Sequence, residues 1–126
     1  MNRDEMLVAL RPSLNLENID TKTLEVFQNQ TLRPILKLQQ DLTFSLLENH
    51  KYYKTQSNTN APRQQYEIFL KKYLQSNTDL KHQILGAIIG QFTSKELEIY
   101  FTERKEINKR IMAMQIKRFL DTIYWV

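Results

Sequence analysis

The chain has 126 residues, of which 41% are hydrophobic and 25% charged, a composition that is ordinary for a single globular domain. Only 2 glycines and 3 prolines are present, too few to supply the turns of an all-β protein, and the lack of cysteine excludes disulfides, thiolate metal sites and thiol nucleophiles. The net charge of +4 arises entirely in residues 61–126, because residues 1–60 carry equal numbers of basic and acidic residues.

The N-terminal sequence MNRDEMLVAL contains acidic residues and no long apolar run, so it does not have the pattern of a signal peptide. No other stretch approaches the roughly 18 apolar residues that a membrane span requires. We therefore expect a cytoplasmic protein without membrane contact.

The first predicted element is a short helix over residues 3–9, within an N-terminal extension formed by residues 1–20. Residues 11–12, an Arg-Pro pair, end this helix. Asp20 or Thr21 can then cap the helix that follows.

A first long helix is predicted over residues 21–53, with a kink at Pro34. Proline inside a helix removes a hydrogen bond and costs about 3 kcal/mol, so packing of an apolar stripe must offset it. The stripe continues in phase across the proline, which favours a kink over a break. Its members are Leu24, Phe27, Leu32, Ile35, Leu38, Leu42, Leu46 and Tyr53.

Two shorter helices are predicted next. The polar stretch TQSNTN at 55–60 reads as a loop, and Ala61-Pro62 suits the start of a helix that ends near Ser76. Another helix follows over residues 79–89, and Gly90 suits its C-terminal end.

The pattern of Thr93 and Glu96 is that of a capping box and predicts a last long helix from Ser94 almost to Trp125. The predicted fold class is therefore all-α. The predicted architecture is a helical bundle of two long helices, the first kinked at Pro34, and two shorter ones, in a single domain of residues 1–126.

Residues with the pattern of a catalytic or metal site are lacking. His50 and His82 lie far apart, and neither has a carboxylate at the spacing of metal ligands. No phosphate-binding glycine loop or serine elbow is present. We therefore expect no metal, no cofactor and no catalytic residue, and the sequence favours a protein that is not an enzyme.

Two stretches, FQNQTLRPILKLQ at 27–39 and GQFTSKELEIYFTERKEINKRIMAM at 90–114, resemble a family of short, uncharacterised, all-helical bacterial proteins. Some relatives carry the label glyoxalase. The glyoxalase fold consists of βαβββ units with a metal held by His and Glu, and this sequence predicts neither the strands nor the ligands. The resemblance implies a helical fold and carries over no catalytic residue.

A polar site is possible at the kink, where Asn29 and Arg33 flank the carbonyl that Pro34 leaves without a donor. The alternative is structural: these residues and the stretch 106–110 clamp the two long helices together. The first interpretation would fit a small enzyme with a polar site near the kink.

The last predicted helix carries two apolar rows. Leu97, Tyr100, Ile107, Ile111 and Met114 form one, and a second lies roughly 100–140° around the axis. We interpret the second row as a homodimer or partner face, although the shorter helices could instead cover it within one chain. This face comprises Met112, Ile116, Phe119, Ile123 and Trp125.

The sequence thus favours a non-enzymatic helical interaction or regulatory protein that acts as a homodimer or adaptor. A weaker alternative is nucleic-acid binding through the basic stretch 104–118, where six bases accompany one acid. Six bases spread around a helix are more commonly a solvated surface, so a nucleic-acid partner is not expected.

Overall fold

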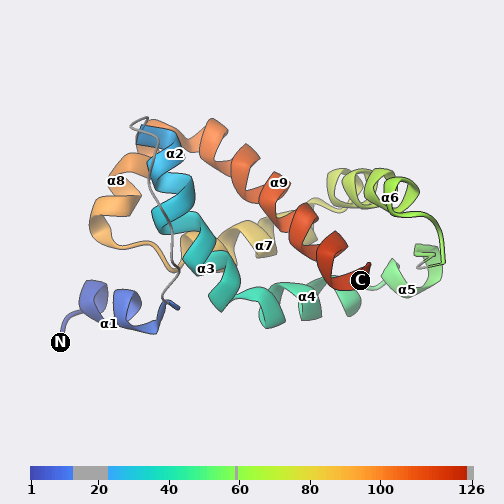
Figure 1. Cartoon of the computed structure of the whole chain (residues 1–126), viewed down its shortest axis with the longest axis horizontal. Coiled ribbons are helices and arrows are strands. Elements are labelled where there is room, and N and C mark those ends of the chain that lie inside the picture. Colours follow the sequence, from blue (N-terminus) through green and yellow to red (C-terminus); the bar gives the residue numbers. More distant parts are fainter. Residues whose placement is uncertain (13–22, 59, 125–126) are drawn as a thin grey trace.

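The computed structural model describes residues 1–12, 23–58 and 60–124, and the all-α prediction is confirmed because these residues form helices and no strand (Figure 1). The described helices are α1 (Arg3–Leu10), α2 (Thr23–Phe27), α3 (Arg33–Leu38), α4 (Gln40–Glu48), α5 (Tyr53–Gln56), α6 (Arg63–Ser76), α7 (Thr78–Ile89), α8 (Ser94–Thr102) and α9 (Arg104–Ile123). The short N-terminal helix is confirmed as α1, whereas the predicted caps Asp20 and Thr21 lie outside the described residues.

Pro34 lacks a backbone N–H, so in a regular α-helix the carbonyl of Gln30 would lose its donor. The chain instead forms a π-helical turn, Gln28–Leu32, in which the N–H of Arg33 donates to the carbonyl of Gln28 five residues earlier. Pro34 thereby falls in the first turn of α3, where a missing N–H removes no helical bond. The helix continues across Pro34 as predicted.

The first long helix is more divided than the predicted span of 21–53. Gln39, with φ −94° and ψ 10°, separates α3 from α4, and the ribbon changes direction there (Figure 1). α4 ends at Glu48, and the side-chain amide of Asn49 donates to the carbonyl of Ser45 at 2.9 Å. The Asn49 bond satisfies a carbonyl at the end of α4, so the helix stops there. The rest of the predicted span is a turn that leads into the short α5.

The prediction of one last helix from residue 94 to residue 125 is wrong. Glu103, with φ −127° and ψ 31°, separates α8 from α9. The hydroxyl of Thr102 donates to the carbonyl of Ile99 at 2.8 Å and so satisfies a carbonyl at the end of α8.

Aromatic side chains hold the corner between α8 and α9. The guanidinium of Arg104 lies 5.8 Å from the ring centre of Tyr100 and 5.4 Å from that of Phe101. The hydroxyl of Tyr100 donates to Asn108 across the corner at 2.8 Å. No glycine or proline marks this corner, so helical periodicity alone predicted an unbroken helix.

The core consists of two clusters, and both α7 and α9 contribute to each of them. The first cluster forms where α2, α3 and α8 meet these two helices, and its buried members are Phe27, Leu32, Ile35, Leu36, Leu85, Ile88, Phe92, Tyr100, Ile107 and Ile111. The second forms toward α5 and α6, and its buried members are Leu47, Tyr53, Tyr66, Leu70, Tyr73, Leu74, Leu80, Ile84, Phe119 and Leu120.

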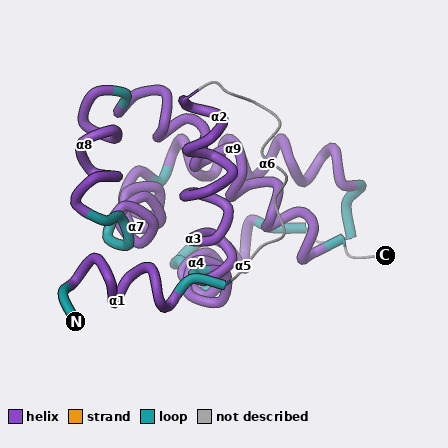
Figure 2. Tube along the Cα trace, turned by 60° about the vertical axis from the view of Figure 1, so that its left-hand side comes forward, coloured by secondary structure: helices purple, strands orange, loops and turns teal. Residues whose placement is uncertain are grey.

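Helix α1 is attached by hydrogen bonds and buries none of its side chains. The guanidinium of Arg3 donates to the carbonyls of Gly90 at 3.1 Å and Phe92 at 2.9 Å. The carboxylate of Asp4 accepts from the N–H of Ser94 at 3.0 Å, at the start of α8. Both views accordingly place α1 beside the turn between α7 and α8 (Figure 1, Figure 2).

Glu96 joins three distant parts of the chain. The predicted capping box is confirmed, because Thr93 Oγ1 accepts from the N–H of Glu96 and Glu96 accepts from the N–H of Thr93. Arg11 adds hydrogen bonds of 2.8 and 2.6 Å to the same carboxylate, and the hydroxyl of Thr31 donates to it at 3.1 Å. The Arg11 and Glu96 side chains are only 9% and 15% exposed, so little water screens this ion pair.

Burial by itself raises the pKa of Glu96, but the hydrogen bonds from Arg11, Thr93 and Thr31 and the charge of Arg11 outweigh burial and lower it. Because this pKa is lower in the folded than in the unfolded state, the ionised carboxylate stabilises the fold at pH values above the unfolded-state pKa. This contribution is lost as the pH falls through the folded-state pKa.

We expect Glu96→Gln to lower the free energy of unfolding at neutral pH by about 3 kcal/mol, because it leaves the charge of Arg11 largely buried and unpaired. Urea denaturation measures this loss. Glu98→Gln, an exposed change on the same helix, is the control and should have little effect. The curves of Glu96→Gln and the unchanged protein should converge in acid, and equal stability at neutral pH would contradict the assignment.

Gln115 lies on the buried face of α9 with 0% exposure, and neither its amide nitrogen nor its oxygen has a hydrogen-bond partner among the described residues. A buried polar group without a partner costs about 1–3 kcal/mol. An apolar side chain of similar length removes this cost.

We therefore expect Gln115→Met to raise the free energy of unfolding by about 1–3 kcal/mol, measured by thermal or urea denaturation. Gln65→Met, at an exposed position of α6, should change stability by less than about 0.5 kcal/mol. A lower stability of Gln115→Met would mean that the amide is satisfied in solution.

Candidate functional site

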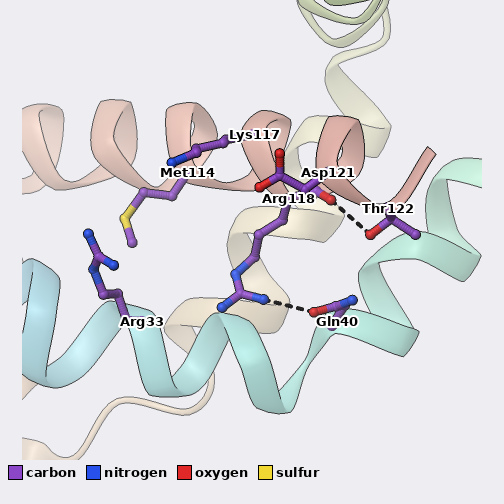
Figure 3. A pocket seen from close by; sticks show the side chains of 7 residues that line it. All are labelled: Arg33, Gln40, Met114, Lys117, Arg118, Asp121 and Thr122. Carbon is purple, nitrogen blue, oxygen red and sulfur yellow. Dashed lines mark hydrogen bonds between the residues drawn. The ribbon is translucent and has the colours of Figure 1, made fainter. Parts of the chain in front are cut away.

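A basic pocket opens between α3, α4 and α9, with a volume of about 540 Å³. Figure 3 shows Arg33 rising from α3 and Arg118 descending from α9 into the space between the helices. The pocket is lined by Arg33, Gln40, Met114, Lys117, Arg118, Asp121 and Thr122. We call it the Arg33 pocket.

The cations of this pocket lack carboxylate partners within the described part of the chain. Arg118 Nη1 donates to Gln40 Oε1 at 2.8 Å, and this neutral bond fixes its guanidinium without cancelling its charge. Asp121 is the only acid in the lining, and its carboxylate pairs with Arg63 at 2.6 Å. Arg33 and Lys117 form no ion pair with any described residue, so the pocket carries a positive charge.

The charges in the pocket interact. Burial lowers the pKa of Arg118, and the positive charge of Arg33 lowers it further, while Asp121 acts in the opposite direction. The two guanidinium groups therefore lie close enough to repel each other. An anion between them would relieve this repulsion.

Part of this pocket was predictable from the sequence. Arg33, predicted as a polar-site residue, lines it, whereas Asn29 lies half-buried in the π-helical turn and is not part of the lining. The stretch 106–110 does contact this helix, because Arg110 donates to Gln28 at 3.0 Å, but this bond involves neither Asn29 nor Arg33, the residues predicted for the clamp. Arg118 was missed as a pocket residue, although its place in the basic stretch 104–118 was a signal.

A second concave surface lies between α6, α7 and α9, with a volume of about 490 Å³, and we call it the lysine groove. Three apolar residues line it, Leu74, Met112 and Ile116. Four lysines line it as well: Lys71, Lys81, Lys105 and Lys109. Lys71 pairs with Glu67 at 3.1 Å, whereas the other three have no ion-pair partner among the described residues.

The predicted partner face is divided by the structure. Met112 and Ile116 line the lysine groove and remain accessible. Phe119 is only 2% exposed and belongs to the second core cluster, so it is not part of an open face. Ile123 is half-buried and packs against the same cluster but does not line the groove. The reason is that the second cluster, which includes α6, covers this part of the row within the same chain. Trp125 lies outside the described residues.

The basic stretch 104–118 does not form a single basic surface. Arg104 lies over the aromatic rings at the α8–α9 corner, and Arg110 bonds to Gln28 and Glu106. The remaining bases divide between the lysine groove and the Arg33 pocket. Nucleic acid usually binds a continuous basic stripe, so this division does not favour such a partner.

A third polar cluster, which the sequence did not predict, surrounds His50. Its Nδ1 lies 2.5 Å from the hydroxyl of Tyr73, and its Nε2 lies 3.0 Å from Asp79 Oδ2. The sequence gave little signal, because these partners are 23 and 29 residues away from His50. A tyrosine, an imidazole and a carboxylate in a row invite comparison with a catalytic relay.

The order of burial in this cluster argues against catalysis. The carboxylate of Asp79 is 62% exposed and the imidazole of His50 is 7% exposed, while Tyr73 is 3% exposed in the core. A catalytic relay needs the opposite order, with the nucleophile toward the substrate and the acid buried. Burial also raises the pKa of Tyr73, which keeps its hydroxyl protonated. The cluster therefore fastens the turn after α4 to α6 and α7.

Comparisons with protein-family models, curated proteins and solved structures gave no match to this chain. Within the described ranges, no group of His, Asp and Glu side chains could hold a metal ion. No helix in these ranges is both long and apolar enough to span a membrane.

The hydrogen bond from His50 lowers the pKa of Asp79. Its stabilising contribution is therefore present above the unfolded-state pKa of the carboxyl and is lost as the pH falls through the folded-state pKa. We therefore expect the melting temperature of Asp79→Asn to fall less than that of the unchanged protein as the pH is lowered.

Asp41→Asn is the matched control, because Asp41 also lies in the first turn of a helix, where the helix dipole favours a carboxylate. Melting curves over the acid range should separate the two variants. Identical pH dependence would show that the His50 bond contributes nothing beyond the dipole.

Proposed function

We propose that this protein is a non-enzymatic adaptor that binds an acidic amphipathic helix of a partner protein in the lysine groove. One observation carries the proposal: the same groove is lined by the apolar side chains of Leu74, Met112 and Ile116 and by four lysines. Leucine-like side chains on one face of a helix would cover the apolar residues, and carboxylates beside that face would meet the lysines.

A second copy of this chain is the alternative occupant, as a homodimer built on Met112 and Ile116. A two-fold interface brings the same surface of both chains together. Here it would bring the lysines of one chain toward those of the other, and like charges in an interface cost several kcal/mol. The charge of the groove therefore favours an acidic partner.

The pattern of polar groups supports a binding role more than an enzymatic one. The His50 cluster has the wrong order of burial for catalysis, and the Arg33 pocket is lined by cations that bind well but are poor bases, because arginine stays protonated. A small enzyme acting at Arg33 remains the alternative.

The test uses a synthetic peptide with leucine at i, i+3, i+4 and i+7 spacing and glutamate elsewhere, labelled for fluorescence anisotropy. A scrambled peptide of equal composition lacks the apolar face. We expect the patterned peptide to bind more tightly, and Lys105→Glu with Lys109→Glu to weaken its binding about tenfold or more, an effect that high salt reduces.

Lys72→Glu with Lys95→Glu is the matched control, because it reverses the same number of charges at exposed positions outside the groove. This control should bind the peptide nearly as the unchanged protein does. Equal binding of both peptides, or equal weakening by both double variants, would overturn the proposal. Light scattering that gives twice the chain mass of 15.1 kDa, lost on Met112→Glu, would favour the homodimer instead.

A further inference from the structure

We propose that Arg33, Lys117 and Arg118 form a binding site for the phosphate group of a small organic phosphate. This site lies in the Arg33 pocket and is separate from the lysine groove. Met112 and Met114 are two positions apart on α9, so they point roughly 200° apart around its axis, and each lines a different cavity. The proposal therefore does not depend on the adaptor function.

The first argument is that three cations from two helices line one pocket with a single acid, Asp121, among the lining residues. Arg33 comes from α3, and Lys117 and Arg118 come from α9. The nearest acid in the lining, Asp121, is held by Arg63 at 2.6 Å. Repulsion between like charges opposes this arrangement, and a bound dianion would turn that repulsion into attraction.

The second argument is that Arg118 is already oriented. Gln40 accepts from its Nη1 at 2.8 Å, and one α9 turn further on the hydroxyl of Thr122 donates to the Arg118 carbonyl at 2.8 Å. Only the Gln40 bond acts on the guanidinium, and a guanidinium held by such a bond loses less conformational freedom when it binds a ligand. Its other N–H groups remain available for two parallel bonds to phosphate oxygens.

The third argument concerns the size of the ligand. The volume of about 540 Å³ lies within the usual range of small-molecule sites, roughly 300–1,000 Å³. Met114 supplies an apolar wall beside the cations (Figure 3). A phosphate with a short organic group would meet both the charged and the apolar part of the lining.

The test titrates the full chain with glycerol phosphate, inorganic phosphate and succinate at constant ionic strength. Binding is followed by the NMR signals of the arginine Nε–H groups. We expect saturable binding of glycerol phosphate and selective shifts at Arg33 and Arg118. Arg33→Gln should weaken binding about tenfold, the usual effect of losing a charge-assisted hydrogen bond.

Lys37→Gln is the matched control, because it removes one exposed charge from the same helix outside the pocket. It should leave the affinity nearly unchanged, and Arg33→Lys should fall between the other two variants because it keeps the charge but loses the planar fork. Lack of saturation, equal weakening by Lys37→Gln, or tighter binding of succinate than of either phosphate would overturn the proposal. Melting curves confirm that each variant is folded.

Discussion

The packing of α7 against α9 is the interaction on which the rest of the fold depends. Each of these helices supplies buried residues to both core clusters, so their contact joins two halves of the molecule that otherwise have separate cores. Ile107 and Ile111 serve the first cluster, and Phe119 and Leu120 serve the second. Burial of one such aliphatic or aromatic side chain is worth about 1.5–3 kcal/mol, so this row anchors α9 firmly.

A firmly anchored α9 fixes the position of its other two sides. One side faces α6 and α7 across the lysine groove, and the other faces α3 and α4 across the Arg33 pocket. Since α9 forms a wall of each cavity, the backbone that carries its lining side chains is held in place by the core. Both cavities are therefore surfaces of an ordered scaffold, which lowers the cost of ordering them on binding.

Periodicity in the sequence was enough to predict helices and the passage of the first long helix through Pro34, and the local Thr-x-x-Glu pattern was enough to predict the capping box at Thr93 and Glu96. The breaks at Gln39 and Glu103 were not predictable in this way, because neither residue is a glycine or proline. The break at Glu103 is held by contacts that form only in the folded chain, such as the hydrogen bond from Tyr100 to Asn108.

The candidate sites were only partly predictable for the same reason. Arg33 was recognisable beside a proline, but the residues that face it lie more than eighty positions further along the chain on another helix. Of the residues predicted as a partner face, Met112 and Ile116 line a concave surface, whereas Phe119 is buried in the core, because periodicity does not tell which side of a helix is covered by the same chain. Spacing along the sequence likewise could not pair His50 with Asp79.

The polar attachment of α1 has a consequence for synthesis on the ribosome. Arg11 and Glu96 are 85 positions apart. At ~5–20 residues per second, the N-terminal segment therefore waits about 4 to 17 seconds for its partner to be made. An apolar docking face would be open to aggregation throughout that interval, whereas the charged groups of Arg3, Asp4 and Arg11 are well solvated by water. The nascent chain can thus keep this segment undocked until α8 has emerged.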